Sequence, residues 1–312
     1  APLAPHPDAL PMTTPQAFGL AGIIGMPVAH SRSPVIHNYW LAEHGIPGRY
    51  LLLPVPPERL SDALRGMVAL GFRGCSVTTP HKQAVMPLIE HIDPMAARIG
   101  AVNTIVVQPD GTLRGFNNDG NGFVQGLRDA KPDWRPDDGP IAVVGAGGAA
   151  RAILVALAAQ GAREIRLVNR RFEKAQQLAA ELGPPIAPVR WERRAEALAG
   201  IATLINATTQ GSAGKPALDL PLDALPRSAI VGDAIYVPPE TPLLAAARMR
   251  GNLTANGLGM LLNQARPAFE SVGVWKYSLS DASSSISRFS SAIRPSAVLI
   301  GMQSWQRASP QG

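Results

Sequence analysis

One stretch decides the fold of this chain: Ile141-Ala142-Val143-Val144-Gly145-Ala146-Gly147-Gly148-Ala149-Ala150-Arg151. Its glycines follow an apolar run that predicts a strand, and they precede an apolar run that predicts a helix over residues 149–160. Glycine permits a tight turn and lets a phosphate approach the N–H groups at the helix start. A second expected strand over residues 165–169 completes a β-α-β unit, in the order typical of dinucleotide binding. The residues predicted to bind the dinucleotide are Gly145, Ala146, Gly147, Gly148 and Ala149, the alternative being a glycine turn that holds no ligand.

The residues after the second expected strand indicate which dinucleotide is bound. Proteins that bind NAD place an acidic residue about 20 residues beyond the glycine turn, where it binds the ribose 2′-hydroxyl. Here the chain reads Asn169-Arg170-Arg171, with Lys174 close by. Two guanidinium groups suit a ribose 2′-phosphate, so the pattern predicts NADP(H). The alternative is that one or both arginines are ordinary surface residues, and Glu173 favours that alternative slightly.

The composition is that of a globular chain. Its 312 residues are 46% hydrophobic and 17% charged, which is enough apolar material for two domains with cores. The longest uncharged apolar run, Ala152–Ala159, is much shorter than the roughly 20 residues of a membrane-spanning helix. We therefore expect no membrane partner.

Charge and cysteine content narrow the function further. The net charge is +6, but the basic residues are scattered, and only pairs such as Arg193-Arg194 occur. We expect small anionic ligands in a positive cleft rather than nucleic acid, the alternative being a solvated surface. The single cysteine, Cys75, excludes an internal disulfide and favours the cytoplasm, and we interpret it as a buried hydrophobe. The histidines lack metal-ligand spacing, so no metal is predicted.

Strand-like and helix-like apolar runs alternate from Phe18 onward. Residues 18–24, 49–55 and 74–78 predict strands, and residues 34–44, 58–70 and 82–92 predict helices. This alternation is typical of β-α-β units and a parallel sheet. The turn Pro109-Asp110-Gly111 between two short apolar runs, 104–108 and 112–115, predicts a hairpin. A polar stretch from Asp129 to Pro140 separates this half from the second alternation.

The two ends of the chain differ from the rest. Residues 1–16 contain five prolines and no hydrophobic period, which predicts a disordered leader. This segment lacks the basic and apolar regions of a signal peptide. Residues 271–312 are rich in serine with poor periodicity, which predicts a loose tail.

A candidate for proton transfer lies in Val77-Thr78-Thr79-Pro80-His81-Lys82. We expect Thr79 to cap a helix and Pro80 to be its first residue, which places Lys82 in the first turn. The positive end of a helix disfavours a charged ammonium group, which suits a lysine that gives and takes a proton. The alternative is a solvated surface lysine.

Two further segments have the chemistry to bind a polar ligand. Asp119, in Asn117-Asn118-Asp119-Gly120, is either a helix cap or a carboxylate that orients a lysine and a substrate hydroxyl. Ser31 and Ser33, on either side of Arg32, form either a simple helix start or a hydroxyl pair that holds a carboxylate.

Taken together, these segments resemble the shikimate dehydrogenase family. Eight blocks match in family order between Phe18 and Glu270, which is far more specific than any one block. The blocks are Gly25-Met26-Pro27-Val28-Ala29-His30-Ser31-Arg32-Ser33-Pro34, Val77-Thr78-Thr79-Pro80-His81-Lys82, Gly100-Ala101-Val102-Asn103-Thr104, Asn117-Asn118-Asp119-Gly120, the glycine turn, Ile205-Asn206-Ala207-Thr208, Asp233-Ala234-Ile235-Tyr236 and Asn256-Gly257-Leu258-Gly259-Met260.

The resemblance implies an α/β fold class: an N-terminal α/β substrate domain with a mainly parallel sheet, a Rossmann NADP-binding domain, and a cleft between them. The substrate domain would span residues 17–118 and be completed by residues 257–270, and the Rossmann domain would span residues 119–256. The implied activity is the reversible, NADPH-dependent reduction of 3-dehydroshikimate to shikimate in chorismate and aromatic amino acid biosynthesis. The implied protein is a cytoplasmic monomer or homodimer.

The resemblance also implies roles for individual residues. Lys82 would be the acid/base, with Asp119 as its partner and as a ligand of the substrate hydroxyls. The implied substrate ligands are Ser31, Ser33, Thr78 and Tyr236 for the carboxylate, and Asn103 and Gln264 for the hydroxyls. The implied cofactor ligands beyond the glycine turn are Asn169, Arg170, Arg171, Thr208 and Gly257.

Three residues depart from the family pattern, and two alternative functions remain open. Asn118 stands where threonine is usual, Thr79 where an aliphatic residue is common, and His81 where phenylalanine is common, so we expect a different pocket wall. One alternative is a quinate/shikimate dehydrogenase of the same family, which the two serines disfavour. The other is a non-catalytic NADP(H) sensor, which the presence of both Lys82 and Asp119 disfavours.

Overall fold

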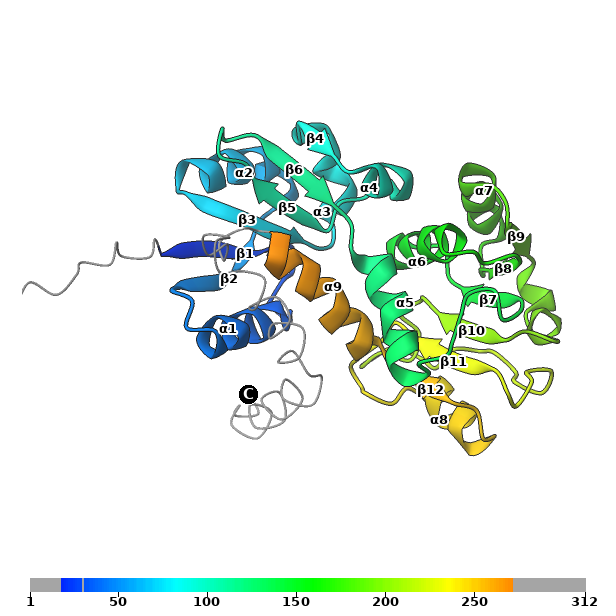
Figure 1. Cartoon of the computed structure of the whole chain (residues 1–312). Coiled ribbons are helices and arrows are strands. Elements are labelled where there is room, and N and C mark those ends of the chain that lie inside the picture. The colour runs from blue at the N-terminus through cyan, green and yellow to red at the C-terminus, as the bar shows by residue number, and fades with distance from the viewer. Residues whose placement is uncertain (1–17, 30, 272–312) are drawn as a thin grey trace, which may run out of the picture.

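The computed structural model describes residues 18–29 and 31–271, and these residues form two lobes, each built around a six-stranded sheet (Figure 1). The predicted α/β class is confirmed. The leader predicted for residues 1–16 lies outside the described residues, as does the predicted tail apart from Ser271, its first residue. Within the described part of the chain, no helix has the length and apolar character needed to cross a membrane.

The first sheet has the strand order β2-β1-β3-β5-β6-β4. Its strands are β1 (Gly19–Gly25), β2 (Gly48–Pro54), β3 (Phe72–Val77), β4 (His91–Ile92), β5 (Thr104–Val107) and β6 (Leu113–Phe116). Strand β1 pairs in parallel with β2 and β3, and β4 pairs in parallel with β6. Strands β5 and β6 form the predicted hairpin, and β5 also runs antiparallel to β3. Most of its strand pairs are therefore parallel.

The helices of the first lobe cover both faces of this sheet. They are α1 (Ser33–Glu43), α2 (Leu60–Ala69), α3 (His81–Ala84) and α4 (Pro94–Ile99). Side chains of α2 and α4 pack on one face against Ile24, Val77 and Ile105. Cys75 is fully buried in the same cluster, and burial raises the pKa of its thiol to about 12, which confirms its interpretation as a buried hydrophobe.

The second sheet is parallel throughout, with the strand order β12-β11-β10-β7-β8-β9. Its strands are β7 (Ile141–Val144), β8 (Ile165–Val168), β9 (Ile186–Val189), β10 (Thr203–Asn206), β11 (Ile230–Asp233) and β12 (Thr254–Ala255). Counted from β7, this is the 3-2-1-4-5-6 order of dinucleotide-binding sheets, in which ligands bind where the order reverses. That point lies between the carboxyl ends of β7 and β10.

Two helices connect the lobes. The remaining helices are α5 (Asp119–Ala130), α6 (Gly148–Ala159), α7 (Phe172–Leu182), α8 (Pro242–Met249) and α9 (Gly257–Ser271). Helices α5 and α9 run side by side from one lobe toward the other (Figure 1). Their backbones come so close that a Cβ atom on Gly122 would lie 2.7 Å from the backbone nitrogen of Gln264. The far half of α9 returns to the first lobe, where Phe269 packs against Trp40 of α1.

The structure corrects two expectations near Lys82. The helix predicted over residues 82–92 is wrong, because α3 ends at Ala84 and a 3-10 turn at Met86–Leu88 follows, where Pro87 lacks an N–H for a helical hydrogen bond. Thr79 does not cap the helix. Instead the N–H of His81 donates to the Thr78 carbonyl at 2.9 Å, so residues 78–81 form a turn from which α3 begins at His81.

Candidate active site

A cavity of about 220 Å³ lies between the two lobes and contains the chemistry predicted from the sequence. The six predicted substrate ligands and both predicted proton-transfer residues line it, namely Ser31, Ser33, Thr78, Lys82, Asn103, Asp119, Tyr236 and Gln264. They come from segments far apart in the chain: the start of α1, the end of β3, α3, the residue before β5, the start of α5, the loop after β11 and the middle of α9. The fold brings all eight together.

Lys82 and Asp119 form an ion pair at the centre of this set. The Lys82 Nζ atom donates to Asp119 Oδ2 at 2.5 Å. The lysine side chain is 29% exposed and the aspartate side chain 9% exposed, so the ammonium group remains accessible from the cleft while the carboxylate is nearly covered. The arrangement gives an accessible proton donor held in place by a buried acceptor.

Asparagine side chains hold Asp119 from the other side. Asn103 Nδ2 donates to Asp119 Oδ1 at 2.9 Å and also lies 3.4 Å from Gln264 Oε1. Asn117 Oδ1 accepts from the N–H of Asp119 at 3.1 Å, while its amide donates to the carbonyl of Ala101. Because both carboxylate oxygens already accept a hydrogen bond, the side chain of Asp119 has one orientation.

Hydroxyl groups line the rest of the cavity. Ser31 Oγ lies 3.3 Å from Ser33 Oγ at the start of α1, where Arg32 precedes the helix and Ser33 is its first residue. Of the two alternatives for this segment, a simple helix start capped by Ser33 is therefore not found, and Ser33 lines the cavity together with Ser31. Burial raises the pKa of Tyr236, and the positive charge of Arg32 partly offsets this rise. Hydroxyl donors therefore line the cavity, and the positive charge of Arg32 acts on one of them, which suits an anionic ligand.

The loops that bring Tyr236 and Thr208 into position are held by Asp233. This buried carboxylate at the end of β11 accepts from Asn206 Nδ2, from the Ile235 N–H and from Thr241 Oγ1. Asn206 Oδ1 in turn accepts from both the N–H and the hydroxyl of Thr208. Burial raises the pKa of Asp233, and the hydrogen bonds that it accepts oppose the rise. One carboxylate thus organises the loops after β10 and β11.

A second hollow, of about 290 Å³, lies where the strand order of the second sheet reverses. Seven of the predicted cofactor ligands line it: Gly145, Ala146, Gly147, Asn169, Arg170, Arg171 and Thr208. Lys174, Trp191, Thr209 and Gln210 line it too, although none of these four was predicted as a ligand. The hollow is bordered by three basic side chains, Arg170, Arg171 and Lys174, all of them exposed.

The glycine turn leaves room for a phosphate above the start of α6. A Cβ atom on Gly147 or Gly148 would meet no atom within 4 Å, so open space lies above both residues. Gly145 has φ +117° and lies against the Ala207 carbonyl, which excludes a side chain there. No side chain caps α6, so its first N–H groups are available to an anion. These features fit the pyrophosphate of a dinucleotide.

A third hollow, of about 390 Å³, connects the cavity around Lys82 with the second hollow, which forms the cofactor groove. Lys82 lines it on one side, and Ala146, Gly147 and Gly148 line it on the other. The remaining two predicted cofactor residues, Ala149 and Gly257, line the substrate cavity itself. A molecule that extends from the groove toward Lys82 therefore reaches the eight polar residues.

The departures from the family pattern do not alter the cavity wall as expected. Asn118 and His81 are not among the residues that line the cavity. The Asn118 amide lies 3.3 Å from Thr104 Oγ1, and His81 is fully buried with its Nε2 atom 2.7 Å from the Val55 carbonyl oxygen. Thr79 lines only the joining hollow. Sequence reasoning missed Ser76, which does line the cavity, because a single serine inside a strand carries no motif.

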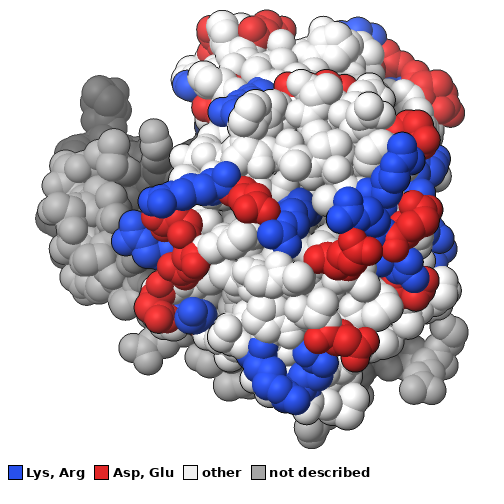
Figure 2. Space-filling view, turned by 90° about the vertical axis from the view of Figure 1, so that its right-hand side faces the viewer, with Lys and Arg blue, Asp and Glu red and all other residues white. Residues whose placement is uncertain are grey.

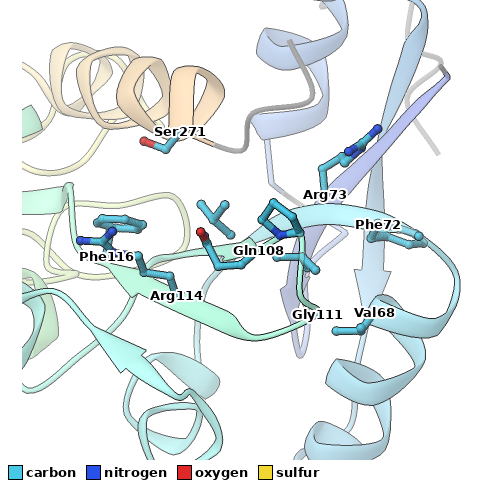
Figure 3. A pocket seen from close by; sticks show the side chains of 12 residues that line it. Val68, Phe72, Arg73, Gln108, Gly111, Arg114, Phe116 and Ser271 are labelled. Carbon is cyan, nitrogen blue, oxygen red and sulfur yellow. The ribbon is translucent and has the colours of Figure 1, made fainter. Parts of the chain in front are cut away.

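A larger hollow lies away from this chemistry. It measures about 750 Å³ and lies over the β5–β6 hairpin, close to Ser271 at the end of α9 (Figure 3). Its wall is made of Val68, Phe72, Phe116 and two arginines among others, and it holds no carboxylate and no lysine. The larger volume and the reactive side chains therefore occur in different hollows. We take the smaller one, which contains Lys82 and Asp119, as the candidate active site.

The outer face of the second lobe carries charges of both signs. Figure 2 shows Lys and Arg interspersed with Asp and Glu across this face. Ion pairs of the second lobe include Arg194 with Asp219 at 2.8 Å and Arg135 with Asp137 at 3.2 Å. Among the described residues, no cluster of three or more His, Cys, Asp or Glu side chains is placed to hold a metal ion.

Two family models and a series of known proteins match this chain. The sequence model of the shikimate dehydrogenase substrate binding domain matches residues 23–105, and that of the shikimate/quinate 5-dehydrogenase family matches residues 134–213. The NADP(+) shikimate dehydrogenase of Paramagnetospirillum magneticum is 55% identical over 251 residues, which are 80% of this chain and 91% of that protein.

Solved structures agree with the sequence comparison. Shikimate dehydrogenase from Thermus thermophilus, in complex with NADP(H) and shikimate, has a TM-score of 0.74 at 35% identity, covering 81% of this chain and 93% of that one. Quinate dehydrogenase from Corynebacterium glutamicum, in complex with NAD, has a TM-score of 0.77 at 30% identity, covering 82% of this chain and 94% of that one. The chain therefore belongs to the shikimate dehydrogenase family.

Proposed function

We propose that this protein catalyses the reversible, NADP-linked interconversion of 3-dehydroshikimate and shikimate, with Lys82 and Asp119 handling the proton. The observation that carries the proposal is the Lys82–Asp119 ion pair, which lies in a cavity of hydroxyl and amide side chains beside a glycine turn that is open to a dinucleotide. The 55% identity to an NADP(+) shikimate dehydrogenase supports the same substrate and cofactor.

Lys82 acts as the general acid in the direction of reduction. Its ammonium group donates a proton to the carbonyl oxygen of 3-dehydroshikimate, which becomes the new hydroxyl group. NADPH, when bound, supplies the hydride that the carbonyl carbon accepts. In the reverse direction the neutral amine of Lys82 takes the hydroxyl proton. Asp119 holds the Lys82 Nζ atom at 2.5 Å and stabilises its positive charge, so the donor stays in position between turnovers.

The remaining cavity residues hold the substrate. Ser31, Ser33, Thr78 and Tyr236 provide hydroxyl groups for its carboxylate, on the side of the cavity near Arg32. Asn103 and Gln264 bind its hydroxyls together with Asp119, to which Asn103 is already hydrogen-bonded. Orientation of the ring by several weak contacts lowers the entropic part of the barrier to hydride transfer.

The second lobe holds the cofactor. Gly145, Ala146, Gly147, Gly148 and Ala149 receive the pyrophosphate at the start of α6, where open space and uncapped N–H groups suit it. The adenosine side lies in the groove of Asn169, Arg170, Arg171 and Thr208, with Lys174 as a third cation for the 2′-phosphate. Asn169 Nδ2 donates to the Arg171 carbonyl at 2.8 Å and shapes this loop. Gly257 borders the nicotinamide end.

The proposal includes an organisation and a location. The substrate-binding domain spans residues 17–118 and is completed by residues 257–270, and the NADP-binding domain spans residues 119–256. The protein works in the cytoplasm, where an NADPH pool is available, as a monomer or homodimer. Sedimentation velocity would distinguish the two assemblies, and fractionation of cells would test the compartment.

A single kinetic experiment tests the substrate and the cofactor. Initial rates are measured with shikimate or quinate as the substrate and NADP+ or NAD+ as the cofactor, in all four combinations. We expect the shikimate and NADP+ pair to have the highest kcat/KM. A dominant rate with quinate would contradict the proposed substrate, and a folded protein that binds NADPH but turns over neither acid would contradict an enzymatic role.

Substitution of Lys82 tests the assigned chemistry. Lys82→Ala removes the proton donor and is expected to lower kcat by about 10²–10⁴-fold with little change in NADP+ affinity. Lys215→Ala, at an exposed lysine far along the chain, is the matched control and is expected to keep the wild-type rate. Near-normal turnover by Lys82→Ala would overturn the role.

A further inference from the structure

Ser76 lies in the wall of the substrate cavity and is held from behind by a buried tyrosine. It is the penultimate residue of β3 and is nearly inaccessible to solvent, yet its side chain is part of the cavity lining. Its Oγ atom accepts a hydrogen bond of 2.7 Å from the hydroxyl of Tyr50 on β2. Two strands of the first sheet therefore meet at a hydroxyl pair beneath the substrate.

Tyr50 is fixed at both its backbone and its ring by helix α1. Asn38 donates from Nδ2 to the Tyr50 carbonyl at 2.9 Å and accepts from the Tyr50 N–H at 3.0 Å. The ring of His37 stacks on the tyrosine ring with centroids 4.0 Å apart and an interplanar angle of 7°. Both rings are buried, so Tyr50 has little freedom to move its hydroxyl.

The direction of the Tyr50 proton sets the direction of the Ser76 proton. Within the described part of the chain, Ser76 is the one hydrogen-bond partner of the Tyr50 hydroxyl, so a Tyr50 proton pointed elsewhere would be buried without an acceptor. Burial also raises the pKa of Tyr50, so the phenol keeps its proton. A serine oxygen that accepts this proton still carries its own O–H, which is left to donate in another direction.

We propose that Tyr50 is a positioning residue for substrate binding: it holds Ser76 as a hydrogen-bond donor that faces the cavity. The Ser76 O–H then meets an acceptor oxygen of the bound hydroxy acid. Tyr50 itself does not line the cavity, and it acts only through Ser76. This inference rests on the proposed function, because it takes the cavity to be the substrate site.

The first test is a comparison of kinetic constants. Tyr50→Phe removes one hydroxyl and leaves the stack on His37 in place. Loss of one oriented, neutral hydrogen bond is expected to raise the KM for shikimate by about 5-fold, with kcat within about 2-fold and an unchanged KM for NADP+. The matched control is Tyr39→Phe, on helix α1. The Tyr39 hydroxyl is hydrogen-bonded to Glu43 at the surface, and its loss is expected to leave all constants unchanged.

The second test is a double-mutant cycle with Ser76→Ala. Ser76→Ala alone is expected to raise the shikimate KM at least as much as Tyr50→Phe, and Tyr50→Phe is expected to add nothing in the Ser76→Ala background. Additive effects in the double variant would overturn the proposal, since Tyr50 would then act by another route. An unchanged KM in Ser76→Ala would also overturn it, and this arm holds even where Tyr50→Phe folds poorly.

The rates of the wild type and of Lys82→Ala distinguish a failure of the proposed function from a failure of the proposed role of Tyr50. A wild-type protein that oxidises shikimate, a Lys82→Ala variant that does not, and a Tyr50→Phe variant with wild-type constants would leave the function standing and refute only the role of Tyr50. A wild-type protein without shikimate turnover would refute the proposed function first.

Discussion

At the scale of single residues, the proposed cofactor groove carries a cluster of positive charge that would favour NADP over NAD. Arg170, Arg171 and Lys174 are exposed and line the same hollow as the glycine turn. None of them is needed to fill the core, so their common location is explained by a ligand with a localised negative charge. The ribose 2′-phosphate is such a group, and NAD has none.

Removing one of these cations is expected to affect one cofactor and spare the other. Arg170→Ser should raise the KM for NADP+ by about 10-fold, the effect of losing one charged hydrogen bond, and leave the KM for NAD+ unchanged. Arg163→Ser is the control, because Arg163 is exposed and forms an ion pair with Asp137 at 3.6 Å, outside the cofactor groove. Equal changes in both KM values would mean that Arg170 binds a part that the two cofactors share.

At the scale of elements, an aromatic cluster connects helix α1, strand β2 and helix α9. His37 stacks on Tyr50 and lies near Trp40 and Phe269, with ring centroids 5.6 and 5.7 Å away. Its Nε2 atom is buried and has no hydrogen-bond partner among residues 18–29 and 31–271, and burial lowers the pKa of His37 to about 3. The cluster is therefore built around a neutral imidazole, and protonation opposes its formation.

This histidine is expected to make the folded state sensitive to acid. In the unfolded chain His37 takes up a proton near pH 6.5, whereas in the folded protein it does so only near pH 3. Its contribution to stability is complete above pH 6.5 and is lost as the pH falls toward 3. In urea titrations at pH 7, 6, 5 and 4, His37→Phe should reduce the pH slope of the unfolding free energy by about one proton.

The control for this measurement is His91→Phe, at an exposed histidine of β4. This variant should keep the wild-type slope. If His37→Phe and wild type lose stability in parallel below pH 6, then His37 is protonated in the folded protein and the buried neutral ring is refuted.

Elements with a local signal were predictable from the sequence, and elements decided by tertiary packing were not. Strand β7 coincides with the predicted residues 141–144, and the Pro109-Asp110-Gly111 turn gives the hairpin of β5 and β6. The helix expected over residues 82–92 was wrong because the apolar pattern of this segment continues past Pro87, where the chain forms a 3-10 turn instead. The eight polar cavity residues were found through the motifs and the family resemblance. Ser76 lies just before the Val77–Lys82 block and Trp191 lies outside every block, so only the assembled sheets show that they line the two hollows.

At the scale of the whole molecule, the first lobe is completed by the last described helix. Leu262, Ala265 and Phe269 of α9 close an apolar cluster with Ile36 and Trp40 of α1. By contrast, α5 belongs to the core of the second lobe, where its Phe123, Val124 and Leu127 pack with β7 and α6. The two lobes therefore differ in how far each depends on the other.

Separate fragments should show this difference. Residues 119–256 keep most of the apolar cluster around β7 and α6, to which the first lobe adds only Ile99 and Ala101 as buried members. They are expected to remain monomeric and to bind NADPH, measured by size-exclusion chromatography and by quenching of tryptophan fluorescence. Residues 18–118 lack α9, so they should expose the α1 cluster and associate. A monomeric 18–118 fragment with cooperative unfolding would show that α9 is dispensable for the first lobe.

The position of Asp119 at the start of α5 determines which distances a motion between the two lobes would change. Lys82 belongs to the first lobe and the glycine turn to the second, while Asp119 stands on the connection between them, tied to the first lobe through Asn103 and Asn117. A rotation about this connection would change the gap between Lys82 and the glycine turn but would hardly alter the ion pair. The same rotation would therefore align the proton donor, Lys82, with the hydride donor held at the glycine turn. The reaction rate would then follow the motion at the connection between the lobes rather than motion within either lobe.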